Sequence, residues 1–209
     1  ENDCNAYVMS NIGIYGACYK LSIIMSLFIQ AFKFAAEPFF FSKMKNADAK
    51  QTYSNVMKVY FIFLSFIFLG VIAYMDILQS FVGAEYRSGL TVVPILLAAN
   101  LCLGVYYNLS IWYKVSDKTI YGAYISIIGA IVTLVLNYLL VPQFGYMGAA
   151  YTTLICYFLI MVICWAFGQK YYPVKYPLKR LFLHTMLAFG LFLLMNNNTI
   201  ANIPLKLFV

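Results

Sequence analysis

The residues best able to do chemistry lie on one apolar segment near the start of the chain. Between positions 12 and 36 this segment holds Lys20, Gln30 and Lys33, and Glu37 follows it directly. Residues three and four apart lie on one face of a helix, so Gln30, Lys33 and Glu37 share a sector. Lys33 and Glu37 are therefore expected to form an ion pair at the end of the helix.

Lys20 points elsewhere, about 80° from Gln30 at 3.6 residues per turn. It lies about 12 Å in from position 12 at 1.5 Å per residue, and no acid stands three or four residues away. A cation at such depth is costly in lipid, so it is expected to face a cavity, where it would suit an anionic group such as a phosphate. Snorkelling of the ammonium to the interface and a structural ion pair are the alternatives.

A second apolar segment, 90–112, carries Pro94, Asn100 and Asn108. Buried amides either join neighbouring helices by hydrogen bonds or line a polar path, and both readings are open for the two asparagines. Pro94 removes a backbone hydrogen bond and predicts a kink. The candidate substrate-binding cavity therefore comprises Lys20, Gln30, Lys33, Glu37, Asn100 and Asn108.

The sequence contains no recognisable catalytic set. It has a single histidine, and no two acids lie three or four residues apart on one apolar segment. A Ser–His–Asp arrangement, a phosphate-binding glycine loop and a CxxC pair are all missing. The cysteines are scattered and are expected to behave as small apolar residues; they are Cys4, Cys18, Cys102, Cys156 and Cys164. We expect no enzyme activity, no metal site and no cofactor.

These residues must be positioned by an unusually apolar chain. Of its 209 residues, 64% are hydrophobic and 10% are charged, and the mean hydropathy is +0.82. Soluble domains are about 45–50% apolar and about 25% charged. This composition excludes a soluble enzyme, a disordered tail and a secreted disulfide-rich module, and it predicts an integral membrane protein.

Six apolar segments approach or reach the roughly 17–25 residues that span a bilayer. Each is expected to be a helix, because backbone groups in lipid must be satisfied internally and the runs do not alternate as barrel strands do. The predicted fold class is all-α, with a bundle of about six transmembrane helices in one membrane domain, 1–209. The segments span 12–36, 56–75, 90–112, 119–141, 147–168 and 181–195.

Basic residues alternate between the connections. The N-terminus, the second and fourth connections and the C-terminus hold only Arg87 and Lys206. Because cytoplasmic loops carry the excess of Lys and Arg, the odd connections are expected inside and both ends of the chain outside. The net charge of +7 is then a sign of membrane orientation, and no nucleic-acid partner is expected. The odd connections and their flanks hold Lys43, Lys45, Lys50, Lys58, Lys114, Lys118, Lys170, Lys175, Lys179 and Arg180.

Small residues and turn residues mark the second half of the chain. Gly129 and Thr133 lie four apart on the segment 119–141, a spacing that permits close helix packing. Pro142, Gly145 and Gly148 predict a tight turn into the next segment. The chain starts at Glu1 in a polar stretch and stops at an apolar IPLKLFV. We therefore expect a piece of a longer polypeptide, incomplete at both ends.

Three motifs follow one another in the chain: Gly13-Ile14-Tyr15 with Tyr19-Lys20, the VGAEYRSG loop before Pro94, and the PQFGYMGAA turn. In these motifs and their spacing the chain resembles polysaccharide flippases of the multidrug/oligosaccharidyl-lipid/polysaccharide exporter superfamily. The resemblance implies the C-terminal lobe of a two-lobed transporter, whose N-terminal lobe would belong to the same polypeptide. It also implies a cationic central cavity, for which Lys20 is the candidate residue.

A flippase of this kind moves undecaprenyl-pyrophosphate-linked oligosaccharide from the inner to the outer leaflet of the bacterial cytoplasmic membrane, in polysaccharide or lipopolysaccharide biosynthesis. The expected partners are this lipid-linked oligosaccharide and the membrane lipids. The alternatives are a cation-coupled drug or small-molecule antiporter of the same superfamily, which would more often show an intramembrane carboxylate, and a non-transporting structural subunit, which would not need Lys20.

Overall fold

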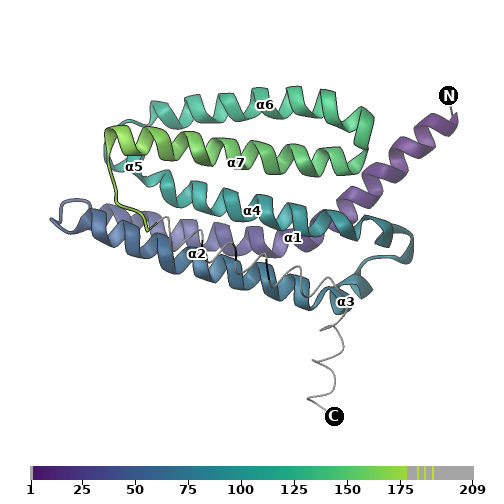
Figure 1. The fold of residues 1–209 in the computed structure, drawn as a ribbon, viewed down its shortest axis with the longest axis horizontal. Helices are drawn as coiled ribbons and strands as arrows, with labels where there is room; N and C mark the ends of the chain where they lie inside the picture. The colour runs from purple at the N-terminus through teal and green to yellow at the C-terminus, as the bar shows by residue number, and fades with distance from the viewer. Residues whose placement is uncertain (1, 178–182, 184–185, 187–189, 191–209) are drawn as a thin grey trace, which may run out of the picture.

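The computed structural model describes residues 2–177 and the single positions 183, 186 and 190. Apart from those three positions, the predicted helix 181–195 lies outside the described residues. The described part is a bundle of α-helices without strands (Figure 1). Its elements are α1 (Asn2–Lys43), α2 (Ala49–Ala73), α3 (Met75–Leu78), η1 (Gln79–Phe81), η2 (Ala84–Thr91), α4 (Val92–Leu109), α5 (Ile111–Val115), α6 (Ile120–Phe144) and α7 (Tyr146–Tyr171).

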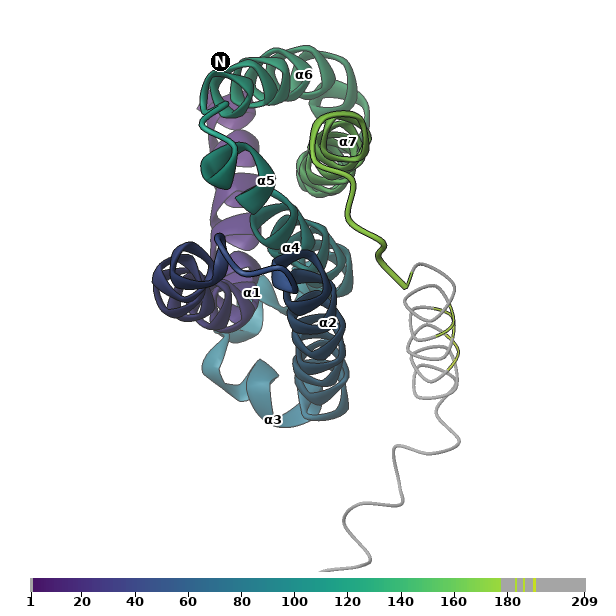
Figure 2. The ribbon, with the colours of Figure 1, turned by 90° about the vertical axis from the view of Figure 1, so that its left-hand side faces the viewer.

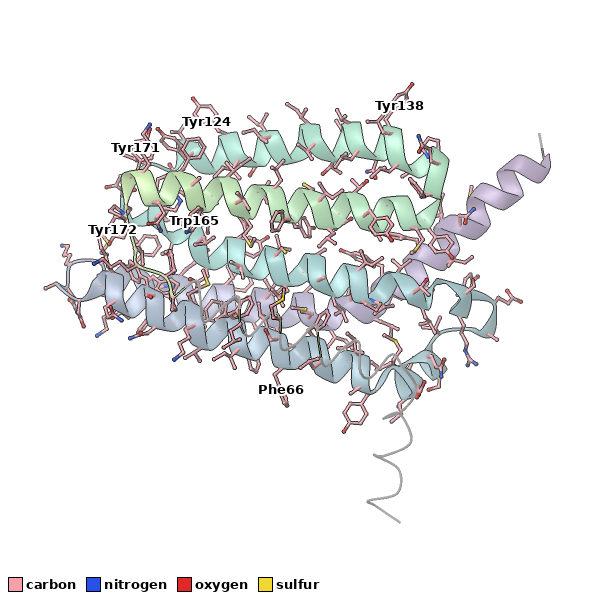
Figure 3. All side chains as sticks on the ribbon, viewed as in Figure 1. Phe66, Tyr124, Tyr138, Trp165, Tyr171 and Tyr172 are labelled. Carbon is pink, nitrogen blue, oxygen red and sulfur yellow. The ribbon has the colours of Figure 1, made fainter. Side chains whose placement is uncertain are left out.

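Among the described residues, five helical stretches are long and apolar enough to cross a membrane. This confirms the predicted all-α membrane bundle, and the chain is a multi-pass membrane protein. The exposed aromatic residues fit this setting. Tyr124 and Tyr138 project from the outer face of α6 near its two ends, where tyrosine favours the membrane interface (Figure 3). The five stretches are Asn11–Lys43, Ala49–Ala73, Ala84–Val115, Ile120–Phe144 and Tyr146–Tyr171.

The helices extend beyond the predicted segments. The first begins at Asn2 and ends at Lys43 instead of spanning 12–36, so its 42 residues reach about 63 Å at 1.5 Å per residue. That is twice the ~30 Å of the hydrocarbon core, and the first turns of α1 project past the other helices (Figure 1). Hydropathy marks only the part of a helix that suits lipid, whereas polar turns continue the backbone hydrogen bonds outside it.

Pro94 does not kink the middle of a helix. It is the third residue of α4 and follows the 3₁₀ segment η2. In a first turn the backbone N–H has no partner within the helix, so proline is tolerated there. The predicted tight turn after α6 is confirmed, because Gly145 has a φ of +56° and only one residue separates α6 from α7.

α4 lies at the centre of the bundle, with α1 and α2 on one side and α7 on the other, and α6 packs on α7 (Figure 2). Of the two small residues predicted to pack, Gly129 lies against Ile160, and the Thr133 hydroxyl lies 3.1 Å from Cys156 Sγ. Otherwise α6 is peripheral, since Ile125 is its one further buried residue.

The bundle has two chemically different ends. We call residues 74–91 with the α6–α7 turn the loop end, and residues 43–50, 114–119 and 170–177 the lysine-rich end. The helices alternate between them, so that α1, α5 and α7 finish at the lysine-rich end. Within the described residues, the loop end carries Arg87, whereas the lysine-rich end carries Lys43, Lys45, Lys50, Lys114, Lys118, Lys170 and Lys175.

Candidate functional site

Lys20 borders a hollow near the loop end. The hollow has a volume of about 390 Å³ and lies between α1 and the segment 81–86, with Lys20 as its one cation among the described residues. The lysine side chain is exposed, and no described acid is within ion-pair distance of it. The remaining lining residues are Ala17, Leu21, Phe81, Val82, Gly83 and Tyr86. An ammonium group beside an open hollow is available to an anion.

The 3₁₀ segment η2 lies beside the part of α1 that precedes Lys20. A Cβ atom at Gly89 would lie 2.3 Å from Ile14 Cγ2, and Cys18 Sγ lies 3.6 Å from the Tyr86 carbonyl. Two residues after Lys20, the Ser22 carbonyl accepts a hydrogen bond from Asn100 in the middle of α4. The depth expected for Lys20 in the membrane stays a prediction.

The ion pair predicted between Lys33 and Glu37 is not the one that the structure shows. Lys114 of α5 donates to Glu37 Oε1 in a short, partly buried contact. Lys33 instead lies over the Tyr107 ring, 4.8 Å from its centroid, where the π face partly balances the charge. Spacing along α1 could not reveal this, because Lys114 and Tyr107 come from elements far along the chain.

Asn100 joins two helices. Its side chain is 4% exposed, and Nδ2 donates to the Ser22 carbonyl of α1 at 3.1 Å. Ser22 in turn donates its hydroxyl to the Tyr19 carbonyl at 2.8 Å. Of the two readings open for this amide, the structure supports helix–helix joining.

Asn108 is different, because neither its Nδ2 nor its Oδ1 has a hydrogen-bond partner among the described residues, although the side chain is 1% exposed. It leaves α4 one turn after Gly104, from nearly the same face. A Cβ atom at Gly104 would lie 3.1 Å from the Tyr60 hydroxyl, which is likewise buried without a partner. Burying an amide in this way is costly, so this interior position stays a candidate for a polar path.

Gln30 is exposed on α1 and adds no contact to these positions. The six predicted residues thus occupy separate places: Lys20 at the hollow, Lys33 and Glu37 toward the lysine-rich end, and the two asparagines inside. That they act in one substrate cavity stays a prediction. Within the part of the chain that the structure describes, no group of three or more His, Cys, Asp or Glu residues could hold a metal ion.

The chain beyond α7 is fastened to the bundle at the lysine-rich end. Ser54 Oγ donates to the Lys175 carbonyl at 2.8 Å, and Gln169 Nε2 donates to the Val174 carbonyl at 2.9 Å. Burial raises the pKa of Tyr172 and of Tyr176, so both remain neutral phenols at physiological pH. These tyrosines therefore add no negative charge to this end.

No protein-family model, curated protein or solved structure matches this chain. A function is therefore argued from the fold and from the positions described above.

Proposed function

We propose that this chain is one lobe of a two-lobed transporter that moves undecaprenyl-pyrophosphate-linked oligosaccharide across the bacterial cytoplasmic membrane, for polysaccharide biosynthesis. One observation carries the proposal: in a multi-pass α-helical bundle, the Lys20 ammonium borders an open hollow and has no described acid as a partner. Ionisable residues in membrane spans mark substrate or ion pathways, and a cation without a carboxylate suits an anionic substrate.

The chemistry of such a substrate matches the bundle. A pyrophosphate carries negative charge to the ammonium, while the polyprenyl chain can stay in lipid against the apolar outer faces of the helices. Two-lobed transporters place their site between the lobes and open it to each side in turn. The face of α1 that carries the exposed Lys20 would then border the central cavity of the whole transporter.

Complementation tests the proposal. The gene for the complete polypeptide that contains residues 1–209 is expressed in a bacterial strain that lacks its own flippase, and the surface polysaccharide is measured. We expect the polysaccharide to return. If it stays absent although the protein accumulates in the membrane, the proposed function is wrong.

The alternatives predict other outcomes. A cation-coupled antiporter would raise drug resistance in a manner that depends on a proton or sodium gradient, and it would need a carboxylate free to titrate. Glu37 already has Lys114 as its ion-pair partner. A structural subunit would change neither drug resistance nor surface polysaccharide.

We further propose that the lysine-rich end faces the cytoplasm and the loop end faces outward. The motive is the distribution of described basic residues, with Arg87 at the loop end against seven lysines at the other. Both Asp48 and Ala84 are exposed and lie at opposite ends, so they are suitable labelling positions.

Cysteine labelling tests this orientation in a background from which the five native cysteines are removed. A membrane-impermeant maleimide added to intact cells is expected to label Ala84→Cys and to spare Asp48→Cys, because reagent reaches only the outer side. Both positions should react after permeabilisation, which serves as the control. Labelling of Asp48→Cys in intact cells would reverse the orientation.

A further inference from the structure

Two lysines share one aromatic ring at the lysine-rich end. Lys118 Nζ lies 4.1 Å from the centroid of Tyr171, and Lys170 Nζ lies 5.6 Å from the same centroid. The two residues come from different elements, since Lys118 precedes α6 and Lys170 closes α7. The fold thus brings two positive charges together on one side chain.

The ring belongs to a compact group of aromatic residues. Trp112 stacks on Tyr171, with ring centroids 5.9 Å apart. The ring centroid of Tyr121 lies 5.0 Å from that of Tyr171 and 5.5 Å from that of Phe167. Trp112 is 2% exposed and donates Nε1–H to the Cys164 carbonyl at 3.1 Å. We call this set the aromatic–lysine cluster; it consists of Trp112, Lys118, Tyr121, Phe167, Lys170 and Tyr171.

The short turn before α6 fixes Lys118 in place. The Lys118 backbone N–H donates to the Tyr113 carbonyl at 2.8 Å, and the Ser116 hydroxyl donates to the Trp112 carbonyl at 2.6 Å. Asp117 takes up a left-handed backbone conformation with φ 56°. The position of Lys118 is therefore set by the helix that carries Trp112.

No described acid lies within ion-pair distance of either ammonium, and the one ion pair among the described residues is that of Lys114 with Glu37. Two positive charges at one ring repel each other, and an anion beside them lowers the free energy. A ring face offsets only part of this cost. The arrangement is thus complementary to a group that carries negative charge.

From this geometry we infer that the aromatic–lysine cluster binds the phosphate of an anionic phospholipid in the leaflet at the lysine-rich end. Tryptophan and tyrosine favour the headgroup level of a bilayer, which puts the cluster at the depth of lipid phosphates. Basic pockets between membrane helices bind such headgroups. The exposed apolar face of α6 begins beside the cluster, at Ile120 and Tyr124, and offers a surface for the acyl chains. This site does not depend on what the protein transports.

Tryptophan quenching tests the inference, because the chain has two tryptophans and one lies in the cluster. In the complete protein, Trp165 and any tryptophan outside residues 1–209 are replaced by phenylalanine, so that Trp112 is the reporter. This protein is placed in phosphatidylcholine nanodiscs that contain increasing fractions of brominated phosphatidylglycerol. We expect quenching to saturate at a low fraction, and the Lys118→Gln, Lys170→Gln double variant to need about tenfold more anionic lipid for half-quenching.

The matched control is the Lys43→Gln, Lys45→Gln double variant, which removes the same charge at the same end from two exposed lysines and should leave quenching unchanged. The Lys118→Arg, Lys170→Arg variant keeps both charges and should retain binding, which separates a lost site from a lost fold. If both glutamine double variants lost quenching equally, the lysine-rich end would attract anionic lipid only diffusely, and the cluster would not be a specific site. Equal quenching by brominated phosphatidylcholine, or competition by inorganic phosphate, would also overturn the assignment to an anionic lipid.

Discussion

Replacing Lys20 by alanine is expected to lower transport of the lipid-linked oligosaccharide by about tenfold in the complete protein, because a charge-assisted contact contributes about 1.5–3 kcal/mol. The side chain is exposed and borders the hollow, so its removal opens no gap in the core. Alanine is also the best helix former, and α1 should stay intact. The measurement is the rate of surface-polysaccharide recovery, normalised to the amount of protein in the membrane.

Two further variants decide what a loss would mean. Lys20→Arg should keep part of the activity, because the charge remains although its hydrogen-bond geometry changes. Lys33→Ala is the control on the same helix, and it should have a smaller effect because Lys33 lies over the Tyr107 ring instead of the hollow. Wild-type transport by Lys20→Ala at equal abundance would mean that the substrate phosphate is held elsewhere.

The membrane bundle was predictable because lipid leaves a chain few choices. A span must satisfy its own backbone hydrogen bonds, so length and hydropathy alone indicate a helix and its approximate place. Turn residues predicted the turn at Gly145, where a positive φ favours glycine. These features depend on residues that are close together in the sequence.

The ends of the helices were less predictable. Polar residues before position 12 gave no reason to extend the first helix, yet outside the lipid a helix continues wherever its own hydrogen bonds are favourable. Pro94 suggested a kink because the helix was expected to start at position 90, two residues before the chain changes from 3₁₀ to α geometry at Val92. Hydropathy therefore locates the lipid-facing part of a helix but not its caps.

The charged contacts depend on tertiary structure. The i,i+4 spacing predicted that Lys33 pairs with Glu37, but the partner of Glu37 is Lys114, which comes from α5. Nothing in the sequence indicated that Lys33 would lie over the Tyr107 ring instead of pairing with Glu37. For the same reason the pairing of Lys118 with Lys170 on one ring could not be read from a single segment.

Replacing Gly148 by alanine is expected to lower the midpoint of thermal unfolding by roughly 10 °C, measured on the purified protein in detergent. A Cβ atom at this position would lie 2.4 Å from the Leu140 carbonyl oxygen and 2.7 Å from its carbon. Both atoms are backbone atoms of α6, so no rotamer change can relieve the overlap. Overpacking of this kind costs about 3 kcal/mol, which is roughly 100-fold in the folding equilibrium.

The matched control is Gly70→Ala, within α2, where an added Cβ atom meets nothing within 4 Å. There alanine should leave the midpoint unchanged or raise it slightly, because glycine weakens a helix by about 0.5–1 kcal/mol.

The Gly148 variant should also loosen α6 first, since Ile125 and Gly129 are the buried residues of that helix and α7 is its main neighbour. Protease cleavage near the α6–α7 turn should then rise before the rest of the bundle unfolds. Equal midpoints for Gly148→Ala and Gly70→Ala would mean that α6 and α7 do not approach each other as closely as their backbones do here.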